Sequence, residues 1–169
     1  MRAVLDACVL YPDLTRSLLL GAAEFGHFSP FWSPRILEEW ARAAARDGAA
    51  AGTLARDAIA GLGRRWPEAS VEPGPVAADL PDPDDLHVLG ACLAAGASFL
   101  VTRNHRDFPT RILARFGVSR ADPDDLLRAF AVEDARLRRL ALDLAAATRD
   151  PPATLFRLAG LPRFARLFR

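Results

Sequence analysis

The chain alternates short apolar runs with longer segments of helical periodicity. Ala3-Val4-Leu5 and Ser98–Thr102 are runs of the kind that buried parallel strands show, and polar residues follow each of them. A short strand is also predicted near Val118. An aromatic segment at Phe28–Trp32 is ambiguous, and a proline-rich stretch contains a strand candidate around Val71. The pattern therefore gives two clear strands, two weaker strand candidates and one segment that it does not assign.

Helical patterns fill most of the intervals between these runs. The helices are expected at Leu14–Gly21, Pro34 to about Arg46, Thr53 to about Gly63, Asp82–Ala95, Thr110–Phe116 and from Asp124 onward. Ser33 provides an N-cap before Pro34, Gly48 and Gly52 are expected to break a helix, and Gly96 to end one. This alternation predicts an α/β fold with a mainly parallel sheet. The last segment, from Pro151, is expected to be an added helical appendage.

Composition indicates one soluble globular domain. The 169 residues are 51% hydrophobic and 25% charged, and no apolar stretch approaches the roughly 20 residues that span a bilayer. Asp6 interrupts the first apolar run before it could form a signal-peptide core, so we expect a cytoplasmic protein without a membrane partner. Cys8 and Cys92 lack zinc-site spacing and are expected to be buried thiols.

Charge is distributed unevenly along the chain. All 22 basic side chains are arginines, and the formal net charge is +1. Nine arginines and four acids follow Leu126, whereas thirteen arginines and seventeen acids precede it. This suggests an acidic functional region and a basic C-terminal one, although an arginine-rich helical tail is ordinarily a solvated face.

Acidic residues occur where parallel strands end. Functional groups in open parallel sheets gather beyond the carboxyl ends of the strands. Asp6 lies at such an end, and so does the loop Arg103–Asp107. A buried acid at a strand end is costly unless it is paired or bound to metal, which favours a functional role for Asp6.

Asp85 has both a structural and a functional interpretation. It belongs to the first turn of a helix, where acids cap the helix and meet its dipole, and Asp82–Leu86 (DPDDL) recurs at Asp122–Leu126. Val88, Leu89 and Cys92 follow Asp85 at helical spacing, so Asp85 should point inward. The stripe after Asp125 is less apolar, and we assign that second copy to capping only.

Clustered carboxylates indicate a metal-dependent reaction. They raise one another's pKa unless a cation neutralises them, and oxygen-rich sites suit Mg²⁺ or Mn²⁺. Such ions activate water and stabilise charge on a phosphodiester, so hydrolysis of a nucleic-acid backbone is the natural reaction. Glu38 and Glu39 border one apolar helix face, and periodicity does not choose between them.

Three stretches of the sequence resemble the PIN-domain family, especially VapC-like toxin ribonucleases of bacterial toxin–antitoxin systems. They are AVLDACVLYP (residues 3–12), SPRILEEWARA (33–43), and the run from PDPDDLHVLGACLAAG (81–96) to FLVTRNHRDFP (99–109). The resemblance implies a three-layer α/β/α sandwich, ribonuclease activity with Mg²⁺ or Mn²⁺, and frequent homodimers. We divide the chain into a PIN-like nuclease domain, 1–132, and C-terminal helices, 133–169, packed on the same domain.

The family's acidic set transfers to Asp6, to Glu39 directly before Trp40, and to Asp85. Asn104 stands where the family has a fourth acid, and Asp107 from the same loop can replace that carboxylate. The expected site is catalytic Asp6, Glu39, Asp85, Asn104 and Asp107, metal-binding Asp6, Asp85 and Asn104, and substrate-binding Thr102, Arg103 and Arg106.

Structural interpretations compete at several of these positions. Asn104 and Asp107 could form a polar turn, and the arginines around the loop could be ordinary surface charges. His87 and His105 show no orienting partner and are expected to be exposed histidines. Trp32, Trp40 and Trp66 are expected in the core.

Three functions follow from these residues. The first is an endoribonuclease that cuts RNA and is held inactive, as a toxin, by a small antitoxin protein. The second is a PIN-like RNA-binding module without catalysis, since Asn104 replaces an acid. The third, a phosphohydrolase with Asp6 as nucleophile, is disfavoured because Cys8 stands where that motif needs its second acid.

Overall fold

A four-stranded sheet forms the centre of the computed structural model, which describes residues 1–169. The strands are β1 (Arg2–Leu5), β2 (Ser29–Phe31), β3 (Phe99–Val101) and β4 (Ser119–Ala121). They are arranged in the order β2-β1-β3-β4, and each neighbouring pair is parallel. The predicted α/β fold with a parallel sheet is confirmed.

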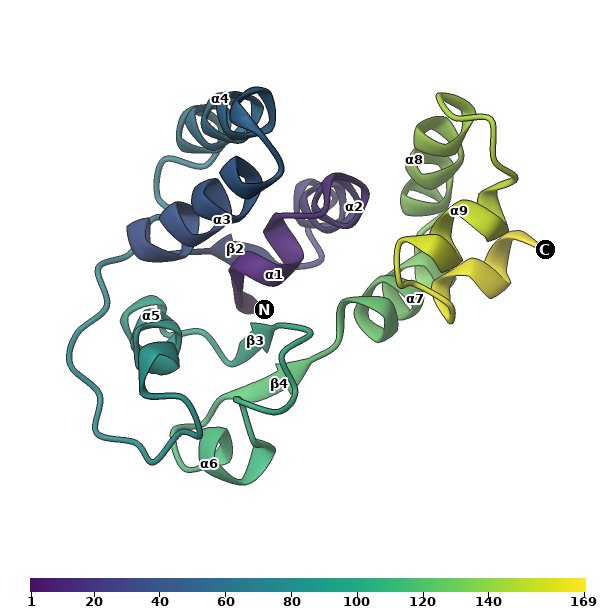
Figure 1. Ribbon diagram of the computed structural model, residues 1–169. Helices are drawn as coiled ribbons and strands as arrows, with labels where there is room; N and C mark the ends of the chain where they lie inside the picture. Colours follow the sequence, from purple (N-terminus) through teal and green to yellow (C-terminus); the bar gives the residue numbers. More distant parts are fainter.

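Helices cover both faces of this sheet (Figure 1). One face carries α1 (Ala7–Leu10), α2 (Asp13–Glu24), α3 (Pro34–Arg46) and α4 (Ala49–Arg65). The opposite face carries the 3₁₀ turn η1 (Pro83–Asp85), α5 (Leu86–Ala95) and α6 (Thr110–Ala114). Because α5 contacts β1, β2 and β3, the sheet is buried on both sides, as its continuous apolar strands require. The expected three-layer sandwich is confirmed.

The C-terminal part lies beside α2, to one side of the sheet (Figure 1). It consists of α7 (Pro123–Glu133), α8 (Ala135–Ala146), α9 (Pro152–Leu158) and the 3₁₀ turn η2 (Phe164–Phe168). One hydrophobic cluster of 40 buried residues includes side chains from the sheet and from this part. The division near residue 132 stays a prediction. None of the helices is long and apolar enough to cross a membrane.

Two local predictions were wrong. Gly52 was expected to break a helix, but it lies inside α4, where an added Cβ would come within 3.2 Å of Ala45 on α3. Close packing of α3 on α4 therefore offsets the roughly 1 kcal/mol that glycine costs in a helix. The strand candidate around Val71 is not a strand, and only an isolated bridge between Trp32 and Ser70 forms there.

The register of the sheet places the ends of β1 and β3 side by side. Leu5 pairs with Val101, and the Asp6 amide donates to the Val101 carbonyl oxygen at 3.1 Å. The chain leaves β1 towards β2 on one side and returns to β3 on the other, which makes this gap the topological switch point of the sheet. Ligands of open α/β sheets bind at such points, and Asp6 and Thr102 are the first residues beyond the two strands.

Candidate functional site

Asp6 is a nearly buried carboxylate at the end of β1. Its exposed fraction is 7%, and its Oδ2 accepts hydrogen bonds from Thr102 Oγ1 at 2.6 Å and from Cys8 Sγ at 3.1 Å. Both bonds reach the same oxygen, which leaves Oδ1 without a protein donor. Because both donors are neutral, the buried negative charge has no matching positive charge from its hydrogen-bond partners.

A chain of polar contacts joins Asp6 to Asp85 across the switch point. The buried Thr102 Oγ1, which donates to Asp6, accepts the Asn104 amide N–H at 2.9 Å. Asn104 Nδ2 in turn donates to Asp85 Oδ2 at 3.3 Å, and Asn104 Oδ1 accepts the Asp107 N–H at 3.4 Å. The loop after β3 therefore brings together residues that lie about 80 to 100 positions apart in the chain.

Asp85 shows how much negative charge converges here. Burial raises its pKa most, and the charges of Asp6, Asp82, Asp107 and Glu39 raise it further, to about 6. Four neighbouring carboxylates thus raise the pKa of a fifth, that of Asp85. A divalent cation at this place would remove the repulsion.

Glu39 approaches the same region from α3. Its Oε1 lies 2.8 Å from His87 Nε2 and 3.4 Å from Arg35 Nε. Burial alone would raise the pKa of Glu39, but the contacts with His87 and Arg35 outweigh it and lower the pKa. Neither ring nitrogen of His87 has hydrogen-bond geometry, so the short contact acts as an ion pair when the imidazole is protonated.

Periodicity did not separate Glu38 from Glu39, but the structure places only Glu39 near Asp85. The Glu38 carboxylate pairs with Arg42 at 2.9 Å on the exposed side of α3. Arg35, one turn before Glu39, also donates to the Asp84 carbonyl oxygen at 3.1 Å. Arg35 therefore ties α3 to η1. Arg35 was not predicted as a site residue, although its four-residue spacing from Glu39 was an available signal.

The histidines differ from expectation. The His87 side chain is only 7% exposed and contacts Glu39, so its prediction as an exposed histidine was wrong. Its partner comes from another helix, 48 positions earlier in the chain, which a local pattern does not show. His105 is half-exposed, with Nε2 3.2 Å from Asp122 Oδ2. Trp32 and Trp40 are buried, as predicted, and Trp66 is half-buried.

Comparison with known families decides which fold family this site belongs to. The sequence matches the PIN domain family over residues 2–106. The chain belongs to the PIN domain family. No curated protein and no solved structure gave a significant match. PIN domains are generally nucleases and typically use divalent metal ions, so nuclease chemistry on nucleic acid is the coarse function of this fold.

The donor chemistry of this PIN domain suits a hard divalent cation. Asp6 and Asp85 offer carboxylate oxygens and Asn104 an amide oxygen, the ligand types that Mg²⁺ and Mn²⁺ prefer. No group of three or more His, Cys, Asp or Glu side chains lies close enough to hold a metal ion. A site with two carboxylates needs no such group, because Mg²⁺ usually keeps several waters.

Cys8 supports Asp6 as a neutral donor. Burial and the neighbouring Asp6 raise the pKa of the Cys8 thiol to about 12, so the thiol keeps its proton. Cys8 is half-buried and Cys92 buried, and neither forms a disulfide. The expectation of buried thiols therefore holds fully for Cys92 and in part for Cys8.

The arginines of the loop after β3 differ in their contacts. Arg103 Nη2 donates to Thr15 Oγ1 at 3.2 Å and to the Ala159 carbonyl oxygen at 2.8 Å, so its charge is engaged within the protein. Arg106 is exposed and forms no hydrogen bond or salt bridge. Of the two arginines, only Arg106 is free to meet a substrate.

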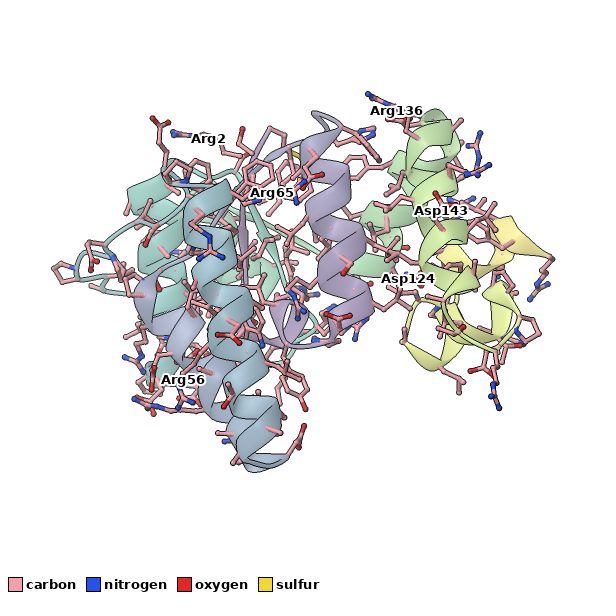
Figure 2. All side chains as sticks on the ribbon, turned by 90° about the horizontal axis from the view of Figure 1, so that it is seen from above. Arg2, Arg56, Arg65, Asp124, Arg136 and Asp143 are labelled. Atoms are coloured by element: carbon pink, nitrogen blue, oxygen red, sulfur yellow. The ribbon has the colours of Figure 1, made fainter.

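The second DPDDL copy does more than cap its helix, which corrects the sequence prediction. Asp122 accepts the Asp124 N–H at 2.8 Å as an N-cap. Asp124, 4% exposed, accepts the N–H groups of Arg163 and Phe164, each at 2.8 Å. Figure 2 shows Asp124 beside the C-terminal segment. The copy therefore holds the end of the chain against α7.

A cavity of about 600 Å³ has a lining that includes neither Asp6 nor Asp85. It is bordered by α2, α3 and α4 and lined by residues such as Tyr11, Arg16, Trp40 and Leu54. None of the residues proposed for catalysis lines it. The cavity therefore shares no residue with the chain of contacts between Asp6, Thr102, Asn104 and Asp85.

Proposed function

We propose that this PIN domain is a divalent-metal-dependent endoribonuclease that hydrolyses RNA phosphodiesters. One observation carries the proposal: the contacts Asp6–Thr102–Asn104–Asp85 at the carboxyl ends of β1 and β3, surrounded by further carboxylates. Negative charge without a compensating cation at the switch point is the feature that a metal-dependent nuclease needs.

The metal ligands would be Asp6 Oδ1, Asp85 and Asn104 Oδ1. Thr102 and Cys8 fix Asp6 Oδ2 and so orient the carboxylate towards the site with its other oxygen. A half-turn of the Asn104 amide would bring its oxygen to the side of Asp85, where Nδ2 now lies. A bound Mg²⁺ or Mn²⁺ would lower the pKa of the attacking water and stabilise charge on the phosphodiester.

Glu39 is proposed to orient the attacking water and to accept its proton. Arg35 and His87 lower its pKa, which keeps the carboxylate ionised, and both hold Oε1 in place. Asp107 adds negative charge beside Asp85 from the loop after β3. It would strengthen cation binding where Asn104 contributes none.

RNA would contact exposed arginines near this loop. Arg106, Arg111 and Arg115 are exposed and form no salt bridge, so they are proposed to meet phosphates. Thr102 is buried against Asp6 and is proposed to support that carboxylate instead of touching RNA. Binding through these arginines would weaken steeply as salt rises.

Metal-dependent cleavage by the purified full chain tests the proposal. Asp6→Asn and Asp85→Asn should each lower the rate with Mn²⁺ by more than the roughly 10- to 100-fold that loss of a supporting residue costs. Asp84→Asn is the matched control, because its side chain belongs to the same turn but is 91% exposed, and its one ionic contact, with Arg35 at 3.7 Å, is open to water. Cleavage that survives both substitutions, or that persists in excess chelator, would refute the metal-dependent nuclease.

An RNA-binding module without catalysis is the second candidate. Asn104 favours it, since this residue adds no charge and its Nδ2 donates to Asp85 Oδ2. Such a module would bind RNA but neither take up Mn²⁺ at the acidic residues nor cut RNA. Calorimetric titration with Mn²⁺ separates the two candidates, because only the nuclease should show binding that Asp6→Asn abolishes.

We further propose a cellular role as the toxin component of a type II toxin–antitoxin system. The PIN fold supports this role, in which a small antitoxin protein would inhibit the nuclease in the cytoplasm and the toxin would form a homodimer. Expression in a bacterial host should arrest growth, and Asp6→Asn should abolish the arrest. Normal growth with active, soluble nuclease would refute the toxin role, and light scattering would test the dimer.

A further inference from the structure

Arg103 connects three parts of the chain at the start of the loop that carries Asn104 and Asp107. Its backbone N–H donates to Cys8 Sγ at 3.3 Å. Its guanidinium Nη2 donates to Thr15 Oγ1 on α2 at 3.2 Å and to the Ala159 carbonyl oxygen, just after α9, at 2.8 Å. One residue therefore joins the acidic site to α2 and to the C-terminal segment.

The turn at Ala159 and Gly160, directly after α9, packs against this guanidinium and accepts its hydrogen bond. Ala159 ends α9, and the last carbonyls of a helix lack partners within the helix and carry partial negative charge. Gly160 has φ +74, and an added Cβ there would lie 3.4 Å from the guanidinium carbon. Glycine thus allows the backbone turn and keeps it close to Arg103.

The two ends of the loop have separate anchors. Arg120 Nη1, from β4, donates to the carbonyl oxygens of His105 at 2.7 Å and Phe108 at 2.8 Å, which holds the second half. The first half, with Asn104, depends on Thr102 and Arg103. Since Asn104 is the residue that contacts Asp85, any movement of the first half changes the acidic site directly.

We propose that Arg103 is a positioning residue through which the C-terminal segment, residues 151–169, holds the loop after β3 in place. This segment lies outside the part of the chain that matches the family, residues 2–106. The proposal rests on the proposed nuclease function for its effect on catalysis. It reassigns Arg103, which the sequence predicted to bind substrate, to a contact within the protein.

Hydrogen exchange of the metal-free full chain tests whether the contacts of Arg103 hold the loop, and it does not require activity. Four amides of this loop donate hydrogen bonds, those of Arg103, Asn104, His105 and Asp107. In Arg103→Met these four amides should exchange roughly tenfold faster. Arg163→Met is the matched control, because Arg163 Nη1 ties the same C-terminal segment to Asp125 Oδ2 on α7, away from the loop. The control should leave loop exchange unchanged.

Kinetics and Mn²⁺ titration measure the consequence for the site. Arg103→Met should lower kcat and raise the Mn²⁺ concentration needed for half-saturation several-fold, with KM for RNA unchanged. A raised KM with unchanged kcat would show a substrate contact instead and overturn the proposal. Equal effects of Arg163→Met would also overturn it, because they would indicate general loosening of the C-terminal segment.

Milder variants protect the test against loss of folding. Thr15→Val removes one acceptor of the guanidinium at nearly constant volume, and Arg103→Lys keeps a cation that can reach one acceptor. Both should raise loop exchange less than Arg103→Met does. Unchanged exchange in all three variants would overturn the positioning role of Arg103. Faster exchange in a protein that cuts no RNA would support this role and refute only the nuclease function.

Discussion

Replacing Asp85 by asparagine should stabilise the metal-free protein while removing its response to metal. Asparagine keeps the size of the side chain and an oxygen that can accept the Asn104 Nδ2–H bond, but it removes the charge. Burial and four neighbouring carboxylates raise the Asp85 pKa from 3.8 to about 6, so ionisation of this group opposes folding at neutral pH.

The magnitude follows from that pKa. Since a tenfold change in an equilibrium is about 1.4 kcal/mol, the unscreened cost of ionised Asp85 would be about 3 kcal/mol. Asp85 is only half-buried, so water and salt reduce the cost, and we expect about 1 to 1.5 kcal/mol. For a chain of this size the Asp85→Asn variant should melt about 3 to 5 °C higher than the wild type at pH 7 in chelator.

The pH dependence has a definite sign. The folded wild type binds this proton more tightly than the unfolded chain does, so its stability should fall as pH rises from about 4 to about 6, through the raised Asp85 pKa. The variant lacks this contribution. Thermal melts at pH 4.5 and pH 7, in chelator and in Mn²⁺, measure both effects. A variant that melts below the wild type at pH 7 without metal, or that gains as much from Mn²⁺, would refute the reasoning.

Three further predictions concern the rest of the molecule. In thermal melts, Gly90→Ala should lower the free energy of unfolding by about 2 kcal/mol, because its Cβ would lie 2.8 Å from the Gly74 carbonyl oxygen. Gly61→Ala should instead raise it by about 0.5 kcal/mol, because the nearest atom to its Cβ would lie 3.8 Å away. Asp124→Asn should lower the free energy of unfolding by about 2 kcal/mol, since its buried carboxylate accepts two backbone N–H groups. The exposed Asp125→Asn should lower it by less than about 1 kcal/mol. The apparent Mn²⁺ affinity, measured by calorimetry, should fall about tenfold per pH unit below about pH 6, where Asp85 takes up a proton; an affinity independent of pH from 5 to 7 would contradict this.

The sequence predicted those parts of the fold that depend on local pattern. The apolar run before Asp6, the cap at Ser33 and the glycine at Gly96 gave β1, the start of α3 and the end of α5 nearly to the residue. Gly52 failed as a breaker because its position is decided by contact with Ala45 on another helix, which local propensity does not contain.

The part of the candidate site that lies at the strand ends could be predicted from the sequence. Asp6 and the loop after β3 follow directly from parallel strands, whose carboxyl ends meet at one edge. Glu39 and His87 were harder, because their contact joins two helices on opposite faces of the sheet and depends on side-chain reach. Periodicity placed Glu38 and Glu39 equally, and only the approach of Arg35 and His87 separates them.

The two DPDDL copies show why identical local sequence supports different roles. Each forms the same capped turn, with the first Asp accepting the N–H two residues later. In the second copy Asp125 has the position of Asp85, and its carboxylate pairs with Arg163 at 2.6 Å. Asp124, beside it, is buried and receives two backbone N–H donors at 2.8 Å, which compensate its burial. In the first copy Asp85 receives one amide donor at 3.3 Å and faces four other acids. Repulsion from these acids makes the ionised Asp85 carboxylate costly in the metal-free fold, and a bound divalent cation would offset that cost.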